Sequence, residues 1–376
     1  MARLTRAETQ RRNRARVLSA ARAEFAERGF HEAGIDAIAE RAELTRGAVY
    51  SNFPGKRALY FEVLADLAED PAADGAESVR TAGGALGALA RAWVARLPLA
   101  TDADDPAARI GAGTVPEILA DEPARRAYAQ LVRFQAVLLG CGLERLRPPA
   151  AAGERRVRMA ETALTTLHGA SRLAAAAPGF GEPFNVVSAC ERLAALDLGD
   201  RWDGPAIVPE PHAADEPWAP PAAFDALRRE PAPLAADGVV AILGLHRFSA
   251  AEDVLRAAPE GAEVTAVAVS GSPAELGPLA RMAVADIRAL LRRALPPGAW
   301  PRLRVVCDES GDVAAAAGVG EPGDATETAV RVEAGRITVR AEGLGAGHAA
   351  AGLSRGRPRR RERDPDREWD GPPSIL

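Results

Sequence analysis

The stretch AELTRGAVYSNFPGKRALY, residues 42–60, gathers side chains that are suited to contact nucleic acid. Arginine can donate two hydrogen bonds to guanine, so Arg46 could reach a base edge, and Asn52 could bind adenine or a phosphate. Tyr50 can donate its hydroxyl to a phosphate. Lys56 stands at the expected start of a helix, where backbone N–H groups and the helix dipole also favour phosphate. These residue types therefore predict base and phosphate contacts within one short stretch.

Two short helices are needed to position these side chains. Apolar residues spaced i, i+3, i+4 and i+7 predict an amphipathic helix over 34–42. Thr45 can cap a second helix over 46–53, and Pro54 ends it. With the turn at 43–45 they form a helix-turn-helix, whose second helix lies in the DNA major groove. Short side chains in the second helix would allow close approach to the bases, namely those of Thr45, Gly47 and Ser51.

The cysteines offer little further chemistry. Cys141, Cys190 and Cys307 are the three in the chain, and their scatter forms neither a disulfide framework nor a metal cluster. We predict no cofactor, no metal site and no catalytic residue. No apolar run reaches membrane-spanning length, and the basic N-terminal segment lacks the apolar region of a signal peptide. We therefore expect a cytoplasmic protein.

Charge is distributed unevenly along the 376 residues, whose net charge is -5. Residues 1–57 hold 12 Arg or Lys against 7 Asp or Glu, a local charge of +5, so the remaining residues carry -10. A small basic region on an acidic body is typical of a protein with a nucleic-acid-binding head.

Apolar periodicity and breaks predict a multidomain chain with an all-helical N-terminal part and a small α/β domain. The expected regions are a helix-turn-helix domain at 1–58, a helical bundle at 59–202, a Pro-rich linker at 203–235, the α/β domain at 236–352 and a disordered basic tail at 353–376. Within the bundle, helices are expected at 84–97, 123–146, 153–176 and 184–197.

Residues 236–352 alternate apolar, β-branched runs with helical segments and close with two alternating strands joined by Ala334-Gly335. Such an order predicts a mixed sheet that ends in a hairpin. The expected strands are 239–245, 264–270, 303–308, 326–333 and 336–343.

The span 12–64 resembles the TetR family of bacterial repressors through the segments AEFAERGF and IDAIAERAELTRGAVYSNFPGKRALYFEVL. The resemblance implies a homodimeric, ligand-responsive repressor that reads a palindromic DNA operator. It assigns contacts near the bases to Thr45, Arg46, Gly47 and Ser51, and phosphate contacts to Tyr50, Asn52 and Lys56.

Two residues depart from the pattern of that family. Glu43 stands where the family normally has glycine, and Gly34 stands near the position of a threonine. A non-glycine residue in a left-handed turn costs about 1 kcal/mol, which a packed domain tolerates. Gly34 lacks a side-chain cap but is itself an acceptable N-cap.

The resemblance also implies a dimer interface and a pocket for a small-molecule effector in residues 59–202. The helices at 153–176 and 184–199 would form a four-helix bundle with a second copy, through apolar residues that include Ala163, Leu164, Leu167, Leu193 and Leu196.

Four residues are candidates for the effector pocket, and each could instead belong to the core or the dimer interface. A pocket between helices is mostly apolar with a few polar anchors. The candidates are Trp93, Phe134, Gln135 and His168.

Residues 239–350 resemble thioredoxin-like proteins, nearest to the peroxiredoxin branch, through VVCDESGDVAAAAGVG and AVRVEAGRITVRAEG. Such enzymes place a reactive cysteine after the first strand. Here that loop, LHRFSAAEDVL, holds His246 and Ser249 and lacks cysteine. We therefore expect a catalytically silent domain. A redox-responsive regulator that uses its cysteines, and a thiol oxidoreductase-like enzyme with a helical extension, are the alternatives.

The tail carries Arg-Gly-Arg-Pro at 355–358, which resembles the AT-hook core that places arginines in an A·T-rich minor groove. A solvated, charged tail is the alternative reading.

Overall fold

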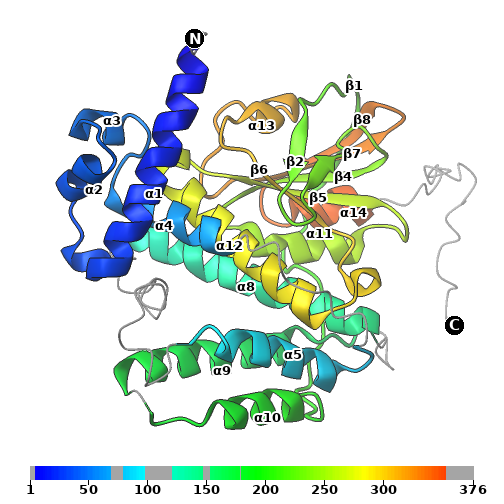
Figure 1. Ribbon diagram of the computed structural model, residues 1–376. Coiled ribbons are helices and arrows are strands. Elements are labelled where there is room, and N and C mark those ends of the chain that lie inside the picture. The colour runs from blue at the N-terminus through cyan, green and yellow to red at the C-terminus, as the bar shows by residue number, and fades with distance from the viewer. Residues whose placement is uncertain (1–4, 69–78, 98–120, 147–152, 178, 353–376) are drawn as a thin grey trace, which may run out of the picture.

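The computed structural model describes residues 5–68, 79–97, 121–146, 153–177 and 179–352, and the predicted tail at 353–376 lies outside them (Figure 1). The helices that were predicted between residues 34 and 197 are confirmed, with ends shifted by a few residues. The helices of this part are α1 (Arg6–Glu32), α2 (Ile35–Arg41), α3 (Arg46–Tyr50), α4 (Lys56–Ala68), α5 (Ala82–Val94), α8 (Glu122–Leu146), α9 (Val157–Ala176) and α10 (Pro183–Leu193).

The first helix has clear start and stop signals. Thr5 and Glu8 form a capping box, because each side chain bonds the backbone of the other residue. Gly29 adopts a φ of 72° and interrupts the helical geometry near the end of α1. Between these ends, Val17 and Phe25 lie in the core with none of their surface exposed, and their spacing of eight residues puts both on one side of the helix.

A glycine permits the close crossing of α8 and α9. A Cβ atom on Gly140 would lie 2.8 Å from the Cα atom of Val157, which starts α9. Only glycine fits such an approach of two backbones.

The second half of the chain folds around a mixed sheet. Its longer helices are α11 (Ala251–Ala257), α12 (Pro273–Ala294), α13 (Asp312–Ala316) and α14 (Ala346–Gly352), with short 3-10 helices η1 (Phe248–Ala250) and η2 (Pro297–Ala299). Its strands are β1 (His212–Pro217), β2 (Ala223–Asp225), β3 (Glu230–Ala232), β4 (Gly238–Gly244), β5 (Glu263–Val269), β6 (Arg304–Cys307), β7 (Glu327–Glu333) and β8 (Arg336–Glu342).

Six strands form the main sheet in the order β1-β8-β7-β4-β5-β6, and β2 pairs with β3 in a separate hairpin. The neighbouring strands β4, β5 and β6 run parallel, with β6 at one edge, whereas β7, β8 and β1 are antiparallel to their neighbours. Ala334 and Gly335 join β7 to β8 with φ values of 50° and 72°. Positive φ at both positions is what a tight hairpin turn requires, so the predicted hairpin is confirmed.

Side chains of β4 alternate between two apolar cores. Val239, Ala241 and Leu243 face the core that is shared with the helices. Val240 and Ile242 face a smaller core that includes Trp218 and Val313 on the other side of the sheet. Burial of both faces explains why the strand reads as a continuous apolar run.

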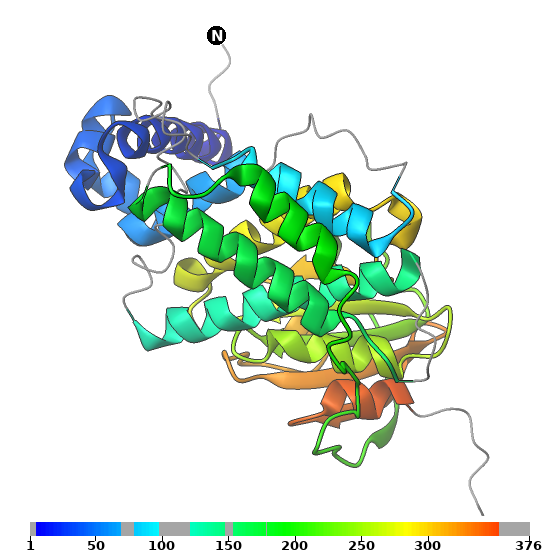
Figure 2. The same cartoon turned by 90° about the horizontal axis from the view of Figure 1, so that it is seen from below.

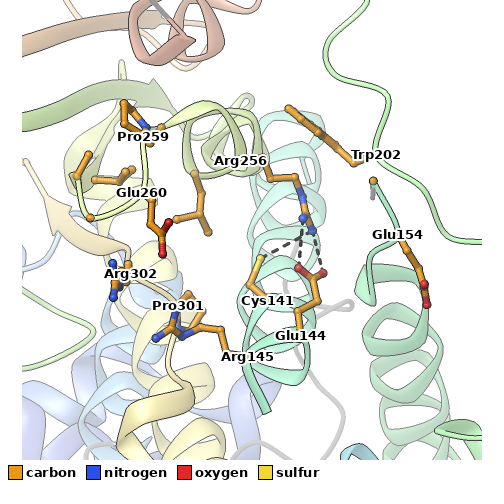
Figure 3. Close-up of a pocket in the computed structure, with 16 residues that line it drawn as sticks. Cys141, Glu144, Arg145, Glu154, Trp202, Arg256, Pro259, Glu260, Pro301 and Arg302 are labelled. Atoms are coloured by element: carbon orange, nitrogen blue, oxygen red, sulfur yellow. Dashed lines mark hydrogen bonds and ion pairs between the residues drawn. The ribbon is translucent and has the colours of Figure 1, made fainter. Parts of the chain in front are cut away.

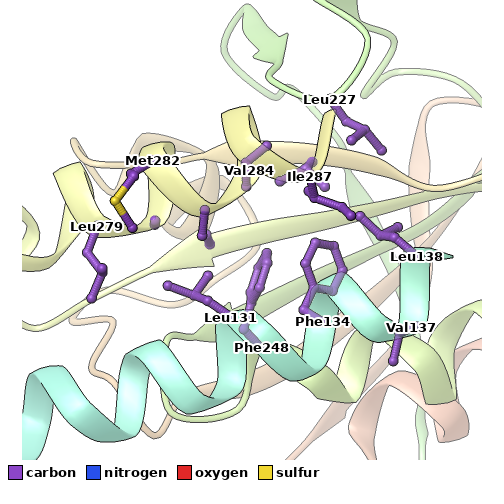
Figure 4. Close-up of a cluster of buried hydrophobic side chains, with 14 of the residues drawn as sticks. Leu131, Phe134, Val137, Leu138, Leu227, Phe248, Leu279, Met282, Val284 and Ile287 are labelled. Atoms are coloured by element: carbon purple, nitrogen blue, oxygen red, sulfur yellow. The ribbon is translucent and has the colours of Figure 1, made fainter. Parts of the chain in front are cut away.

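The long helix α12 joins the sheet to the N-terminal helices. It packs against α4, α5 and α8 on one side and against β5 and β6 on the other. Figure 4 shows Leu131 and Phe134 of α8 meeting Leu279 and Ile287 of α12 in one buried cluster. The apolar core therefore runs without interruption from the helical part into the α/β part.

The Pro-rich segment at 203–235 is folded, in contrast to the extended linker that its composition predicts. It contains β1, β2 and β3, and β1 pairs with β8 at the edge of the sheet. The guanidinium of Arg340 on β8 donates to Glu216 on β1 at 2.9 Å. Trp218 is buried and donates its indole N–H to the carbonyl of Leu234 at 2.7 Å. The pairing of β1 with β8 joins residues more than a hundred positions apart, so local composition does not reveal it.

Within the described ranges, no helix combines the length and the apolar character that crossing a membrane requires.

Candidate nucleic-acid interface

The turn between α2 and α3 is left-handed at Glu43, whose φ is 51°. The Glu43 side chain extends into solvent and accepts a hydrogen bond from Arg16 of α1 at 2.7 Å. The amide of Leu44 donates to the carbonyl of Ala39 and closes the end of α2. Glu43 therefore adopts the conformation that glycine would adopt without cost, and its pairing with Arg16 offsets part of that cost.

The helix α3 begins with a side-chain cap. The hydroxyl of Thr45 accepts from the amide of Ala48 at 3.2 Å. The cap satisfies one of the N–H groups that a helix start leaves unpaired. On the inner side, Val49 is 1% exposed and packs into the core, which fixes the rotation of α3.

The outer side of α3 is a continuous exposed surface. Arg46 lies 3.4 Å from a carboxylate oxygen of Asp36 on α2, and its guanidinium is 5.6 Å from the centre of the Tyr50 ring. Tyr50 is 43% exposed although it is a large aromatic residue. The structure brings together five of the seven predicted DNA-contacting residues on this surface: Thr45, Arg46, Gly47, Tyr50 and Ser51.

Gly47 lies in the middle of this surface with open space around it. A Cβ atom there would meet a single neighbour, the Thr45 hydroxyl oxygen at 3.9 Å. Gly47 has an ordinary helical backbone conformation, so its φ does not require glycine. Packing within the described part of the chain therefore does not require glycine at position 47.

Asn52 bonds to its own helix. The side-chain amide of Asn52 donates to the Ala48 carbonyl at 2.8 Å, and the backbone carbonyl of Asn52 accepts from Arg14 of α1 at 3.2 Å. These bonds close the C-terminal end of α3. Asn52 can therefore hold α3 against α1, and a direct DNA contact by its side chain stays a prediction.

Lys56 makes its bonds at the end of α1. Its ammonium donates to the carbonyls of His31 and Ala33 at 3.2 and 3.0 Å and lies 4.7 Å from the centre of the Phe30 ring. Burial lowers the pKa of Lys56. Two of its three N–H groups thus satisfy carbonyls at the helix terminus, which leaves one for a phosphate.

Arg14 is a positioning residue that the sequence analysis missed. Its guanidinium lies 4.4 Å from the centre of the Phe53 ring and 2.9 Å from a carboxylate oxygen of Glu62 on α4. Together with its bond to Asn52, these contacts tie α1, the end of α3 and α4. Arg14 lies three residues before the buried Val17, so helical spacing alone places it on the buried side of α1.

The four residues predicted to line an effector pocket are not gathered in one place. Phe134 is 1% exposed, and its ring centre lies 4.6 Å from that of Phe248 in η1. Gln135 is buried and donates to the carbonyl of Ala283 in α12 at 2.9 Å. Both residues therefore hold α8 against the α/β part.

Trp93 and His168 contact each other between α5 and α9. Their ring centres are 4.8 Å apart in an edge-on arrangement. The Trp93 indole donates to Ser171 at 2.8 Å, while the buried Nε2 atom of His168 lacks a hydrogen-bond partner among the described residues. Burial lowers the pKa of His168.

The loop after β4 docks onto α8. His246 Nε2 lies 3.0 Å from the carbonyl oxygen of Pro123, and the Ser249 hydroxyl donates to Gln130 at 2.7 Å. His246 and Ser249 thus hold this segment against α8.

The three cysteines are poor candidates for reactive thiols. Cys141 and Cys190 are buried, and Cys307 is partly buried. Burial raises the pKa of Cys141, and it raises the pKa of both Cys190 and Cys307 to about 11. Thiolate is the reactive form, so these environments disfavour redox chemistry near neutral pH. The described residues include no cluster of His, Cys, Asp and Glu that could hold a metal ion.

Residues 17–63 match the family described as bacterial regulatory proteins, tetR family. Among solved structures, a TetR transcriptional regulator from Rhodococcus sp. RHA1 aligns at 16% identity with a TM-score of 0.31, over 50% of this chain and 95% of that chain. A TetR-like transcriptional regulator from Rhodococcus sp. RHA1 aligns at 20% identity with a TM-score of 0.28, over 51% of this chain and 97% of that chain. No curated protein matches the chain. The family match alone supports a TetR-family N-terminal domain at residues 17–63.

Proposed function

We propose that the chain is a DNA-binding transcriptional repressor that inserts α3 into the major groove of an operator. The observation that carries the proposal is the exposed outer side of α3, with Arg46, Gly47 and Tyr50 on a helix whose inner side is locked by Val49. Arg46 would reach a base edge, and Tyr50 would donate to a phosphate. Gly47 would let the helix backbone approach the bases, which explains a glycine that internal packing does not require.

We further propose that two copies associate through the outer side of α9 and α10, as a palindromic operator requires. Phe180 and Phe184 are 74% and 75% exposed, and Leu173 is 49% exposed. Large apolar side chains this exposed are typical of an interaction surface. Figure 2 shows α9 and α10 on the outside of the molecule, away from the sheet. Three residues that were predicted for the interface lie instead in the core of the single chain: Ala163, Leu164 and Leu167.

For the α/β part we propose a thioredoxin-like fold without thiol chemistry. The order β6-β5-β4-β7-β8, with the last two strands forming a hairpin, supports this fold. The docking bonds of His246 and Ser249, together with the raised thiol pKa values, favour a structural or sensory role over an enzyme. Since α12 packs on α4, this part is well placed to influence the DNA-binding head.

DNA binding is tested by selecting sequences from a random duplex pool with the full chain and measuring the affinity of the enriched duplex. We expect Tyr50→Ala to weaken binding at least tenfold with an unchanged thermal unfolding curve. Gly47→Ala should raise stability by about 0.5–1 kcal/mol, because alanine favours a helix, yet lower the DNA affinity. Failure of the parent to enrich any sequence, or full affinity in both variants, would overturn the proposal.

A further inference from the structure

A cavity of about 620 Å³ lies at the junction between the helical part and the α/β part. We call it the junction cavity. The C-terminal turn of α8 forms one side, and the connection from α11 to β5 forms the other (Figure 3). Trp202, the segment at 153–154 and residues 301–302 complete the lining. Its volume falls within the range typical of sites for small organic ligands.

Paired charges build one wall of the junction cavity. Arg256 donates to both carboxylate oxygens of Glu144 at 2.9 and 3.2 Å and to Glu252 at 2.7 Å. Arg155 donates to the same oxygen of Glu252 at 2.7 Å. These side chains are 12–19% exposed. The hydrogen bonds between these side chains fix the shape of this wall. Because the positive and negative charges balance, the charge of a ligand must be matched by other residues of the cavity.

Apolar side chains also line the junction cavity. Leu255, Val264 and Pro301 line it, together with the indole of Trp202. The Trp202 N–H donates to Asp253 at 3.2 Å, and the Arg256 guanidinium lies 6.0 Å from the indole ring centre. The indole is therefore held in place and offers a flat apolar surface to a ligand.

Two further arginines line the cavity without a carboxylate partner in the described part of the chain. Arg145 donates to the carbonyl of Gly298 at 3.2 Å, and the exposed Arg302 follows Pro301 directly. Both guanidinium groups can therefore form charge-assisted hydrogen bonds with an anionic ligand in the cavity. Glu260 also lines the cavity and lacks an ion pair within the same ranges.

From this arrangement we infer that the junction cavity binds a small organic anion with an apolar body. The carboxylate of the ligand would bind Arg145 and Arg302, because guanidinium groups match carboxylate geometry. The apolar body would lie along Leu255, Val264 and Trp202. The inference rests on the proposed function in one respect, since it makes this anion the effector of the regulator.

The helix α8 connects the junction cavity to the DNA-binding head. It carries Glu144 and Arg145 at one end, and Asp121 caps its other end by accepting from the amide of Ala124 at 2.8 Å. Asp121 also pairs with Arg57 in the first turn of α4. A helix of this length spans about 37 Å and transmits a displacement as a rigid body. Suppose that α8 can adopt two positions, each with its own position of the DNA-binding head. An anion that binds more tightly to one of them would shift the equilibrium toward the corresponding position of the head.

Three probes that share one eight-carbon chain test the ligand class: octanoate, 1-octanol and octylamine. Titration calorimetry on the full chain without DNA should show one octanoate bound per chain, with octanol at least tenfold weaker. Arg302→Gln should weaken octanoate about tenfold, because a charge-assisted hydrogen bond is lost. Glu260→Gln should strengthen it, because a competing carboxylate is removed. Equal binding of octanol, tighter binding of octylamine, or an unchanged affinity in Arg302→Gln would overturn the anion site.

The place of binding can be read from the parent chain, in which every residue of the cavity is unchanged. Octanoate should shift the NMR signal of the Trp202 indole N–H, assigned through Trp202→Phe, and leave that of Trp218 unchanged. Trp218 lies across the sheet in the smaller core and serves as the internal control. A shift of Trp218 with none of Trp202 would place the ligand elsewhere and contradict the inference.

The regulatory step is measured separately with the selected DNA duplex. Octanoate should change the DNA affinity of the parent chain and leave that of Arg302→Gln unchanged. If octanoate binds but the DNA affinity stays constant, the effector role is overturned while the DNA-binding function stands. If no duplex is ever enriched, the DNA-binding function fails, and the calorimetry still decides whether the anion site exists.

Discussion

Arg57, in the first turn of α4, donates to the carboxylate of Glu275 in the first turn of α12 at 3.2 Å. The contact joins the helix that follows the DNA-binding head to the α/β part, 218 positions further along the chain. A second contact lies further along the same two helices, where Arg281 pairs with Glu62. The head is therefore attached to the α/β part by charges as well as by the shared apolar core.

Glu62 is the residue on which the second contact depends. Its carboxylate is 10% exposed and pairs with both Arg14 and Arg281. We expect Glu62→Gln to lower the free energy of unfolding by about 2 kcal/mol, because both charge-assisted bonds are weakened. Urea unfolding measures the loss. Glu321→Gln, an exposed glutamate in a loop, is the matched control and should stay within about 0.5 kcal/mol of the parent. Equal stability of the two variants would contradict a role of Glu62 in joining the parts.

Glu43 offers a test of the left-handed turn between α2 and α3. Glu43→Gly removes the cost of a Cβ atom at a φ of 51° and gives up an exposed ion pair with Arg16. Since the first effect is about 1 kcal/mol and exposed pairs contribute less, we expect a gain of a few tenths of a kcal/mol or more. Glu43→Val should destabilise, because β-branched residues fit this conformation poorly. Thermal unfolding gives both values, and a loss of stability in Glu43→Gly would show that the Arg16 pair dominates.

The helices and the central strands could be predicted because their signals are local. The apolar runs of β4 and β5, and the Ala334-Gly335 turn, were sufficient to place the strands. The exposed side of α3 could also be predicted, because short or polar residues gather there, and the structure shows them exposed while Val49 is buried.

The remaining features depend on contacts that are distant in sequence. The strand β1, HAADEP, has no apolar alternation and is held by pairs such as Arg340 with Glu216. Lys56 and Asn52 resemble DNA-contacting residues, yet their hydrogen bonds go to carbonyls of α1 and α3. The junction cavity could not be foreseen, because its lining comes from separate parts of the chain that meet only in the folded protein.

His168 should make stability depend on pH. Burial lowers the pKa of His168 below its ordinary 6.5, although nearby Asp286 acts in the opposite direction. As the pH falls through 6.5, the unfolded chain therefore binds a proton before the folded chain does. Stability should fall between pH 6.5 and the lower folded-state pKa, and His168→Gln should remove this part of the loss. Urea unfolding between pH 5 and 7 measures it, with the exposed His212→Gln as control. If both variants keep the pH dependence of the parent, His168 is not responsible for it.

Phe184 tests the proposed association of two copies. Its side chain is 75% exposed at the start of α10, beside Phe180, so Phe184→Asp should leave the fold of the single chain intact. Placing a carboxylate in an apolar interface costs several kcal/mol, because the charge loses its hydration. We therefore expect the variant to sediment as a monomer at concentrations at which the parent is a dimer. Phe224→Asp is the matched control, because Phe224 is 51% exposed in the β2–β3 hairpin, far from α10 in the fold. A dimer that survives Phe184→Asp but dissociates in Phe224→Asp would place the interface on the α/β part.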